Sequence, residues 1–99
     1  MSEPVRRVLV AYDVSNDARR DRVAVALQEL GERVQYSVFI VDGRPASFVR
    51  LRCTLESIID HATDRILLCD LGPRDRTDRR LTFIGRQPRL SGDSPALIM

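Results

Sequence analysis

The stretch VLVAYDVSNDARRDR, residues 8–22, decides how the rest of this chain can fold. Its first five residues suit a buried strand, which we extend to residues 5–13. The strand stops at Asp13, and the turn Ser15-Asn16-Asp17 offers three candidate N-caps for a following helix. A carboxylate at the end of a buried strand is either a solvated strand end or helix cap, or the start of a site.

Composition predicts one soluble globular domain. The chain has 99 residues, of which 43% are hydrophobic and 30% are charged. No apolar run is long enough to span a bilayer, and residues 1–7 lack the apolar core of a secretory signal. We therefore expect a cytoplasmic protein with no membrane partner. Cys53 and Cys69 fit no zinc spacing, so we expect both to be buried free thiols.

The basic residues are unusual, because all 16 of them are arginine. One explanation is a genome-wide coding bias, since surface composition drifts where it contacts nothing. The other is phosphate binding, because a guanidinium group binds phosphate oxygens through two parallel hydrogen bonds. Composition does not separate the two explanations. The positions of the arginines favour a partial role in phosphate binding.

Apolar periodicity predicts alternating strands and helices. Helical spacing covers residues 18–30, with Gly31 placed as a C′ glycine, and recurs more strongly over residues 46–61. The arginine-rich residues 74–80 indicate an exposed loop. The further predicted strands are residues 33–42 (one long strand, or two short ones bent near Ser37), residues 64–71 and residues 81–85.

This order predicts an α+β fold, a ferredoxin-like sandwich with two helices on one face of a mostly antiparallel sheet. The strands are nevertheless apolar on both faces, and leaving one face in water costs about 25 cal/mol per Å². We therefore expect a homodimer through the sheet face. The single domain is expected to span residues 1–99, with its core at about 5–85 and with residues 86–99 packing on the dimer partner.

A dimer of this kind changes the meaning of Asp13. Alternation places Val8, Val10 and Tyr12 on one face of the strand, and Leu9, Ala11 and Asp13 on the other. A two-fold axis through the second face would bring each Asp13 towards its symmetry mate. Facing carboxylates repel unless a proton or a cation lies between them, and magnesium is held by one or two carboxylates with waters and phosphates. The alternative is that Asp13 caps or solvates a strand end.

Two motifs at a fixed distance carry a resemblance to a known family. Tyr12-Asp13-Val14 closes the first strand, Arg20 and Arg22 open the first helix, and GERVQYSVF follows at residues 31–39. Together they resemble the CRISPR-associated protein two family, the small partner of the integrase that captures new spacers. The resemblance extends over about residues 5–85. Many members carry an acidic residue directly after SVF, and this chain departs from them.

The departure falls at Ile40, which replaces that acidic residue. Otherwise the resemblance implies a ferredoxin-like homodimer with Mg²⁺, or another divalent cation such as Mn²⁺, held between paired Asp13 residues. Asp13 is then both the catalytic and the metal-binding candidate. The implied partners are the CRISPR integrase subunit and double-stranded DNA or RNA.

The resemblance leaves two functions open. Some members of the family are regarded as metal-dependent nucleases acting on RNA or double-stranded DNA. Others act as a non-catalytic bridge between integrase dimers. The chain is therefore expected to be an endonuclease of CRISPR adaptation or a DNA-binding adaptor in the same pathway, and a toxin-like ribonuclease of this fold is a more distant alternative.

The remaining candidate residues are arginines and motif residues. Arginine at a helix N-terminus opposes the macrodipole unless a phosphate binds there, and solvated pairing with Asp17 or Asp21 is the alternative. The motif residues other than Asp13 fit a nuclease site through the resemblance, whereas by themselves they are strand residues. The nucleic-acid-binding candidates are Arg19, Arg20, Arg22 and Arg33, and the motif residues are Tyr12, Ser37 and Phe39.

Overall fold

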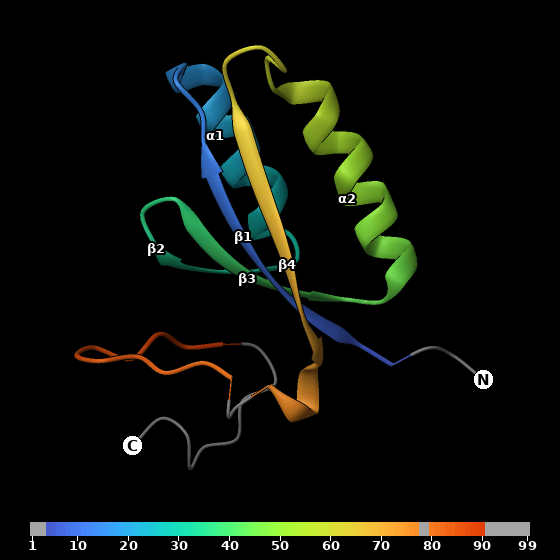
Figure 1. Ribbon diagram of the computed structural model, residues 1–99, viewed down its shortest axis with the longest axis vertical. Helices are drawn as coiled ribbons and strands as arrows, with labels where there is room; N and C mark the ends of the chain where they lie inside the picture. The colour runs from blue at the N-terminus through green and yellow to red at the C-terminus, as the bar shows by residue number, and fades with distance from the viewer. Residues whose placement is uncertain (1–3, 78–79, 91–99) are drawn as a thin grey trace.

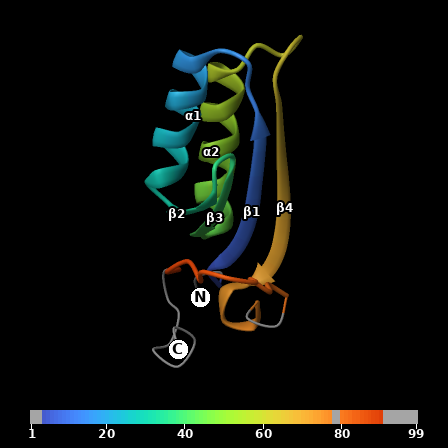
Figure 2. The same ribbon diagram turned by 90° about the vertical axis from the view of Figure 1, so that its left-hand side faces the viewer.

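The computed structural model describes residues 4–77 and 80–90. Four antiparallel strands form one sheet in the order β2-β3-β1-β4, and both helices lie on one of its faces (Figures 1 and 2). The predicted ferredoxin-like sandwich is therefore confirmed. The elements are β1 (Arg6–Asp13), α1 (Asp17–Gln28), β2 (Gly31–Gln35), β3 (Val38–Gly43), α2 (Pro45–Ile58), β4 (Arg65–Pro73) and the short 3₁₀ helix η1 (Arg74–Arg76).

The central strand β1 has one face in the core and one face open, as its alternation predicts. Val8, Val10 and Tyr12 are buried under the helices. On the other face, Leu9 and Ala11 are half-buried and Asp13 is exposed. We call this second surface the open face; it includes Leu67 and Cys69 of β4, which pair with Ala11 and Leu9 respectively.

The apolar stripe of α2 supplies the other half of the core. Leu51 and Leu55 are buried, and Phe48 and Ile58 pack beside them. The helix ends three residues before the predicted limit of residue 61, because Ile59 already has an extended backbone with ψ of 161°. The turn that follows is closed by backbone hydrogen bonds, so the chain reverses at once into β4.

The predicted strand at residues 33–42 is two strands, β2 and β3, joined by a turn at Tyr36 and Ser37. Gly31 does not end the helix, because α1 stops at Gln28 and Gly31 begins β2. A Cβ at Gly31 would lie 2.0 Å from the Ile40 carbonyl oxygen. The glycine is therefore required by the close approach of β3 and not by a left-handed helix end.

Two further predictions were wrong. Cys53 and Cys69 are exposed in this chain, because Cys53 lies on the side of α2 opposite the Leu51 and Leu55 stripe and Cys69 lies on the open face. Residues 81–85 form no strand, because the chain leaves the sheet after η1 and runs below β2 and β3 (Figure 1), where no strand pairs with it.

The predicted packing of residues 86–99 on a dimer partner stays a prediction. Residues 86–90 are irregular, with Leu90 buried in its own chain, and residues 91–99 lie outside the described part. Within residues 4–77 and 80–90, no helix is both long and apolar enough to cross a bilayer.

Candidate metal and nucleic-acid site

Asp13 is the last residue of β1 and lies opposite Arg65, the first residue of β4. Its side chain is exposed, and among the described residues it has no hydrogen-bond or ion-pair partner. A free carboxylate is a hard oxygen ligand of the kind that Mg²⁺ prefers. The donor chemistry at Asp13 therefore fits a divalent cation.

One chain provides little more than this carboxylate. No group of three or more histidine, cysteine, aspartate or glutamate side chains converges in the described ranges, residues 4–77 and 80–90. Magnesium bound by proteins often uses one or two carboxylates and completes its shell with water and phosphate. A cation site at Asp13 therefore needs ligands beyond the described residues of one chain.

The motif residues hold the end of β1 against the β2–β3 turn. The Tyr12 N–H donates to the Ser37 carbonyl at 3.0 Å, and the Tyr12 hydroxyl donates to the Tyr36 carbonyl at 3.4 Å. The Tyr12 and Phe39 rings are buried with their centroids 6.2 Å apart. In the single chain Tyr12, Ser37 and Phe39 therefore serve packing, and they position the strand that presents Asp13.

Arg19 is held by an aspartate from a distant part of the chain. Its Nε lies 2.8 Å from Oδ2 of Asp64, and its Nη2 lies 3.3 Å from Oδ1. The Asp64 side chain has no solvent-exposed area, and it also accepts from the Ser15 and Asp60 N–H groups at 3.3 and 2.9 Å. Sequence reasoning missed this pair, since only the register of β1 and β4 brings the start of α1 next to the loop before β4.

These contacts change the acid–base behaviour of Asp64. The Arg19 guanidinium, followed by the Asp60 N–H, holds the pKa of the Asp64 carboxyl well below its ordinary value. The Asp64 carboxylate is therefore charged at neutral pH and stays charged to lower pH than an ordinary aspartate. Arg19, in turn, directs two N–H groups of its guanidinium at the Asp64 carboxylate, so it faces this partner rather than a phosphate.

The other candidate arginines differ in how much of their guanidinium is free. Arg20 donates to the Val14 carbonyl at 2.9 Å and pairs with Asp17. Arg22 is exposed on α1. Arg33 is also exposed and lies over the Tyr36 and Phe39 rings, with its guanidinium carbon 5.8 and 5.3 Å from the two centroids.

A second buried ion pair closes the far end of β1. Arg7 contacts Asp42 at 2.9 and 3.1 Å, and its Nη1 lies 3.4 Å from the Thr77 hydroxyl. Arg7 and Thr77 are 1% and 0% exposed. The chain after η1 is therefore anchored at Thr77 to the sheet, and this part of the predicted exposed loop is buried.

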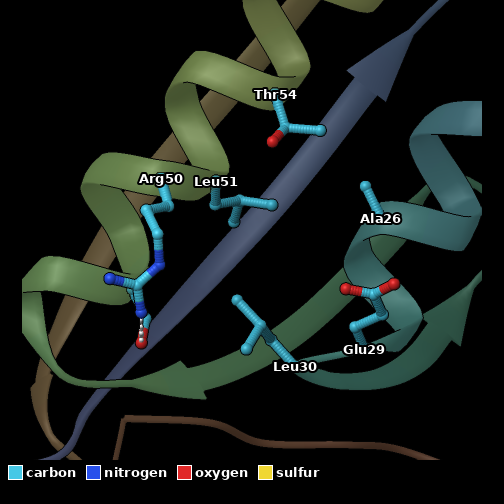
Figure 3. A pocket seen from close by; sticks show the side chains of 7 residues that line it. Ala26, Glu29, Leu30, Arg50, Leu51 and Thr54 are labelled. Carbon is cyan, nitrogen blue, oxygen red and sulfur yellow. Dashed lines mark hydrogen bonds between the residues drawn. The ribbon is translucent and has the colours of Figure 1, made fainter.

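A cleft of about 380 Å³ lies between α1 and α2, away from the open face. Figure 3 shows Glu29 and Leu30 facing Arg50, Leu51 and Thr54 across it. Arg50 is held by the Ser47 hydroxyl at 3.4 Å. Since Asp13 projects from the opposite face of the sheet, this cleft is separate from the candidate site.

Comparison with known proteins agrees with the fold and the motifs. The sequence profile of the family described as CRISPR associated protein Cas2 matches residues 6–79. The CRISPR-associated endoribonuclease Cas2 3 of Rhodospirillum rubrum is 38% identical over 96 residues, which cover 92% of this chain and 99% of that protein. The CRISPR-associated endonuclease Cas2 of Halalkalibacterium halodurans is 34% identical, with coverage of 91% and 97%.

A solved structure shows the same architecture. Streptococcus pyogenes Cas2 superimposes with a TM-score of 0.71 at 38% identity, covering 80% of this chain and 99% of that one. The profile match and the two similar proteins extend over most of the chain. The chain therefore belongs to the Cas2 family.

Proposed function

We propose that this chain is a divalent-metal-dependent endonuclease of CRISPR spacer acquisition that cleaves RNA or DNA phosphodiesters in the cytoplasm. The observation that carries the proposal is the exposed Asp13 carboxylate at the end of the central strand, which has no partner among residues 4–77 and 80–90. Its position on the open face of a Cas2-family chain supports the proposal. So do the endoribonuclease and endonuclease names of the proteins from R. rubrum and H. halodurans.

The proposed site is formed by a homodimer. Leu9, Ala11 and Leu67 line the open face, and Leu67 is 57% exposed. A second copy packed on this face removes that apolar surface from water. The same two-fold axis brings Asp13 towards the partner's Asp13, which supplies the second carboxylate for one Mg²⁺ or Mn²⁺.

The bound cation supplies Lewis-acid polarisation of a phosphoryl oxygen and a lowered pKa for the attacking water. Asp13 holds the cation and fixes the phosphate relative to the protein. The exposed guanidinium groups of Arg22 and Arg33 bind neighbouring phosphates without reading bases. Arg20 contributes through whatever donors its contacts with Val14 and Asp17 leave free.

A non-catalytic adaptor that bridges integrase dimers on duplex DNA is the second candidate function. It is favoured by one observation: the described residues bring no further carboxylates together around Asp13. A nuclease with a single shared cation is expected to be slow. The adaptor uses the same arginines and the same dimer, but it does not need the cation.

The substitution Asp13→Asn separates the two functions, because it removes the charge and nearly preserves the shape. We expect it to abolish metal-dependent cleavage while the metal-free dimer stays as stable as the native protein or becomes slightly more stable, since two facing charges are removed. Nuclease assays, spacer-acquisition assays and metal-free melting check this. Lost cleavage with retained acquisition favours the adaptor, whereas cleavage that survives contradicts the proposed site.

A further inference from the structure

The Asp64 carboxylate joins three segments at the end of the molecule where Asp13 lies. Figure 1 shows the end of β1, the start of α1 and the start of β4 together at this end. Asp64 accepts from Arg19 in α1, from Ser15 in the β1–α1 loop and from Asp60 in the α2–β4 loop. We propose that Asp64 is a positioning residue that sets the orientation of Asp13 for cation binding, an inference that rests on the proposed function.

Asp64 and its neighbour Arg65 hold the backbone on the two sides of Asp13. On the loop side, Ser15 follows Asp13 by two residues, and both its N–H and its hydroxyl lie within 3.5 Å of Asp64 Oδ1. The intervening Val14 is 3% exposed, so its side chain is fixed in the core. On the strand side, Arg65 follows Asp64 directly and pairs with Asp13 across the sheet. Little backbone freedom is left at Asp13 while these contacts hold.

The positioning needs a carboxylate and not only a polar group of the same size. Oδ2 accepts from Arg19 and from the Asp60 N–H at 2.8 and 2.9 Å, and Oδ1 accepts from Ser15 and from the Thr63 hydroxyl at 3.2 Å. An asparagine in this place replaces one acceptor oxygen by an NH₂ group that only donates. Arg19 Nε and the Asp60 N–H at Oδ2 can only donate, whereas the Ser15 and Thr63 hydroxyls at Oδ1 can also accept. The NH₂ group is therefore expected at the Oδ1 position, where the Ser15 N–H loses its acceptor and the anchoring of the loop fails.

Loss of the Asp64 contacts is expected to lower the affinity of Asp13 for the cation. A ligand whose supporting contacts are lost binds a metal about 10- to 100-fold more weakly, although the ligand itself is unchanged. We expect Asp64→Asn to weaken Mn²⁺ binding by that order while Asp13 is still present. The Ser15 amide should also exchange its hydrogen faster in this variant, with or without metal, because its acceptor is lost.

The test measures Mn²⁺ binding by calorimetry and amide exchange by NMR, both on the full-length chain. Asp70→Asn is the charge-matched control, because Asp70 is likewise an aspartate paired with an arginine, Arg6 of β1, at 2.9 Å, but it lies within β4 at the other end of the strands. Asp42→Asn is the stability control, since it disturbs the buried Arg7 pair far from Asp13. Both controls should keep the Mn²⁺ affinity and the Ser15 exchange rate of the native protein.

Each result has one reading. Weaker Mn²⁺ binding and faster Ser15 exchange in Asp64→Asn, with neither change in the two controls, support the positioning role. Equal losses in Asp64→Asn and Asp42→Asn overturn it, because they show general destabilisation. Unchanged Ser15 exchange in Asp64→Asn overturns it without reference to metal. If Asp13→Asn leaves Mn²⁺ binding intact, the proposed metal site itself is wrong, and that outcome is distinct from the others.

Discussion

Arg19, Arg20 and Arg22 occupy neighbouring positions in α1 and have different partners. Arg19 is bound to Asp64, Arg20 is partly used by Val14 and Asp17, and Arg22 is exposed. A guanidinium that is paired with a carboxylate adds less net positive charge, so we expect it to release fewer counterions from nucleic acid than a free one. The position of an arginine in the sequence therefore says less about phosphate binding than the partner that the fold gives it.

This division predicts the salt dependence of duplex binding. Arg22→Ala and Arg33→Ala should each lower the log–log slope of affinity against salt by about 0.9, because each removes one phosphate contact. Arg19→Ala should change the slope less. It should also lower the melting temperature, since it leaves the buried Asp64 carboxylate without the guanidinium that pairs with it. Binding titrations at several salt concentrations, with Arg52→Ala on α2 as the control, measure the slope. Unchanged slopes for Arg22→Ala and Arg33→Ala would show that the two arginines are solvated surface residues that do not contact phosphates.

The lowered pKa of Asp64 predicts how stability responds to acid. Because the folded state holds this proton more weakly than the unfolded state does, the stabilisation is complete above the unfolded pKa of about 4 and is lost as the pH falls towards the folded pKa. The native protein should therefore lose free energy of unfolding between about pH 5 and pH 3, and Asp64→Asn should lose less. Urea melts across this range measure both. Parallel curves for the two proteins would show that Asp64 contributes nothing to the acid response.

At the level of the residue, sequence reasoning predicts exposure better than it predicts partners. The alternation of Val8, Val10 and Tyr12 against Asp13 follows from a period of two and is confirmed. The partner of Arg19 lies 45 residues away in the chain. No local pattern encodes such a contact, because it depends on the register between β1 and β4.

At the level of the element, the β2–β3 hairpin depends on a glycine at its start. The backbone of β3 approaches Gly31 so closely that Gly31→Ala must separate the two strands, and we expect a loss of about 1–3 kcal/mol in the free energy of unfolding. Gly43→Ala is the matched control. Its Cβ would meet the Ser47 side chain at 3.1 Å, which can shift. Denaturant melts should show a clearly larger loss for Gly31→Ala, and equal losses would contradict the close-approach argument.

The elements that sequence predicted well are those with their own periodic signal. The apolar run of β1 predicts its strand to within one residue, and the stripe of α2 predicts its helix except for the last three residues. The division of residues 33–42 stayed open, because a tight turn at Tyr36 and Ser37 contains neither glycine nor proline to mark it. The predicted strand at residues 81–85 is absent because a β-strand requires a hydrogen-bonded partner strand. Apolar alternation in the sequence does not show whether such a partner is present.

At the level of the whole molecule, the open face leaves apolar residues of β1 and β4 without a layer of helices over them. Figure 2 shows both helices on one side of β1 and β4 and no helix on the other. Ile40, which stands where many family members carry an acidic residue, pairs with Leu9 but is 2% exposed, so this side of the sheet is covered at Ile40 and open only at β1 and β4. A carboxylate there would be buried, so the apolar replacement suits the position in this chain.

The open face predicts a dimer at micromolar concentration that one charge can disrupt. Leu67→Asp places a carboxylate in the proposed interface and should shift the protein towards monomer, because burying an unpaired charge is costly. Val25→Asp is the control, since Val25 is equally exposed, 58% against 57%, but lies on α1. Sedimentation velocity distinguishes the two variants. A native protein that is already monomeric, or a Leu67→Asp variant that stays dimeric, would contradict the proposed site between two Asp13 residues.

The stoichiometry of Mn²⁺ binding tests the central claim most directly, because Asp13 supplies one carboxylate per chain and the proposed site needs two. Calorimetric titration of the native dimer should show one Mn²⁺ for each pair of chains, and Asp13→Asn should bind none at this site. Both chains of a pair would then contribute to a single cation on the two-fold axis. One Mn²⁺ for each chain, or binding that persists in Asp13→Asn, would contradict a cation shared between Asp13 and the partner's Asp13.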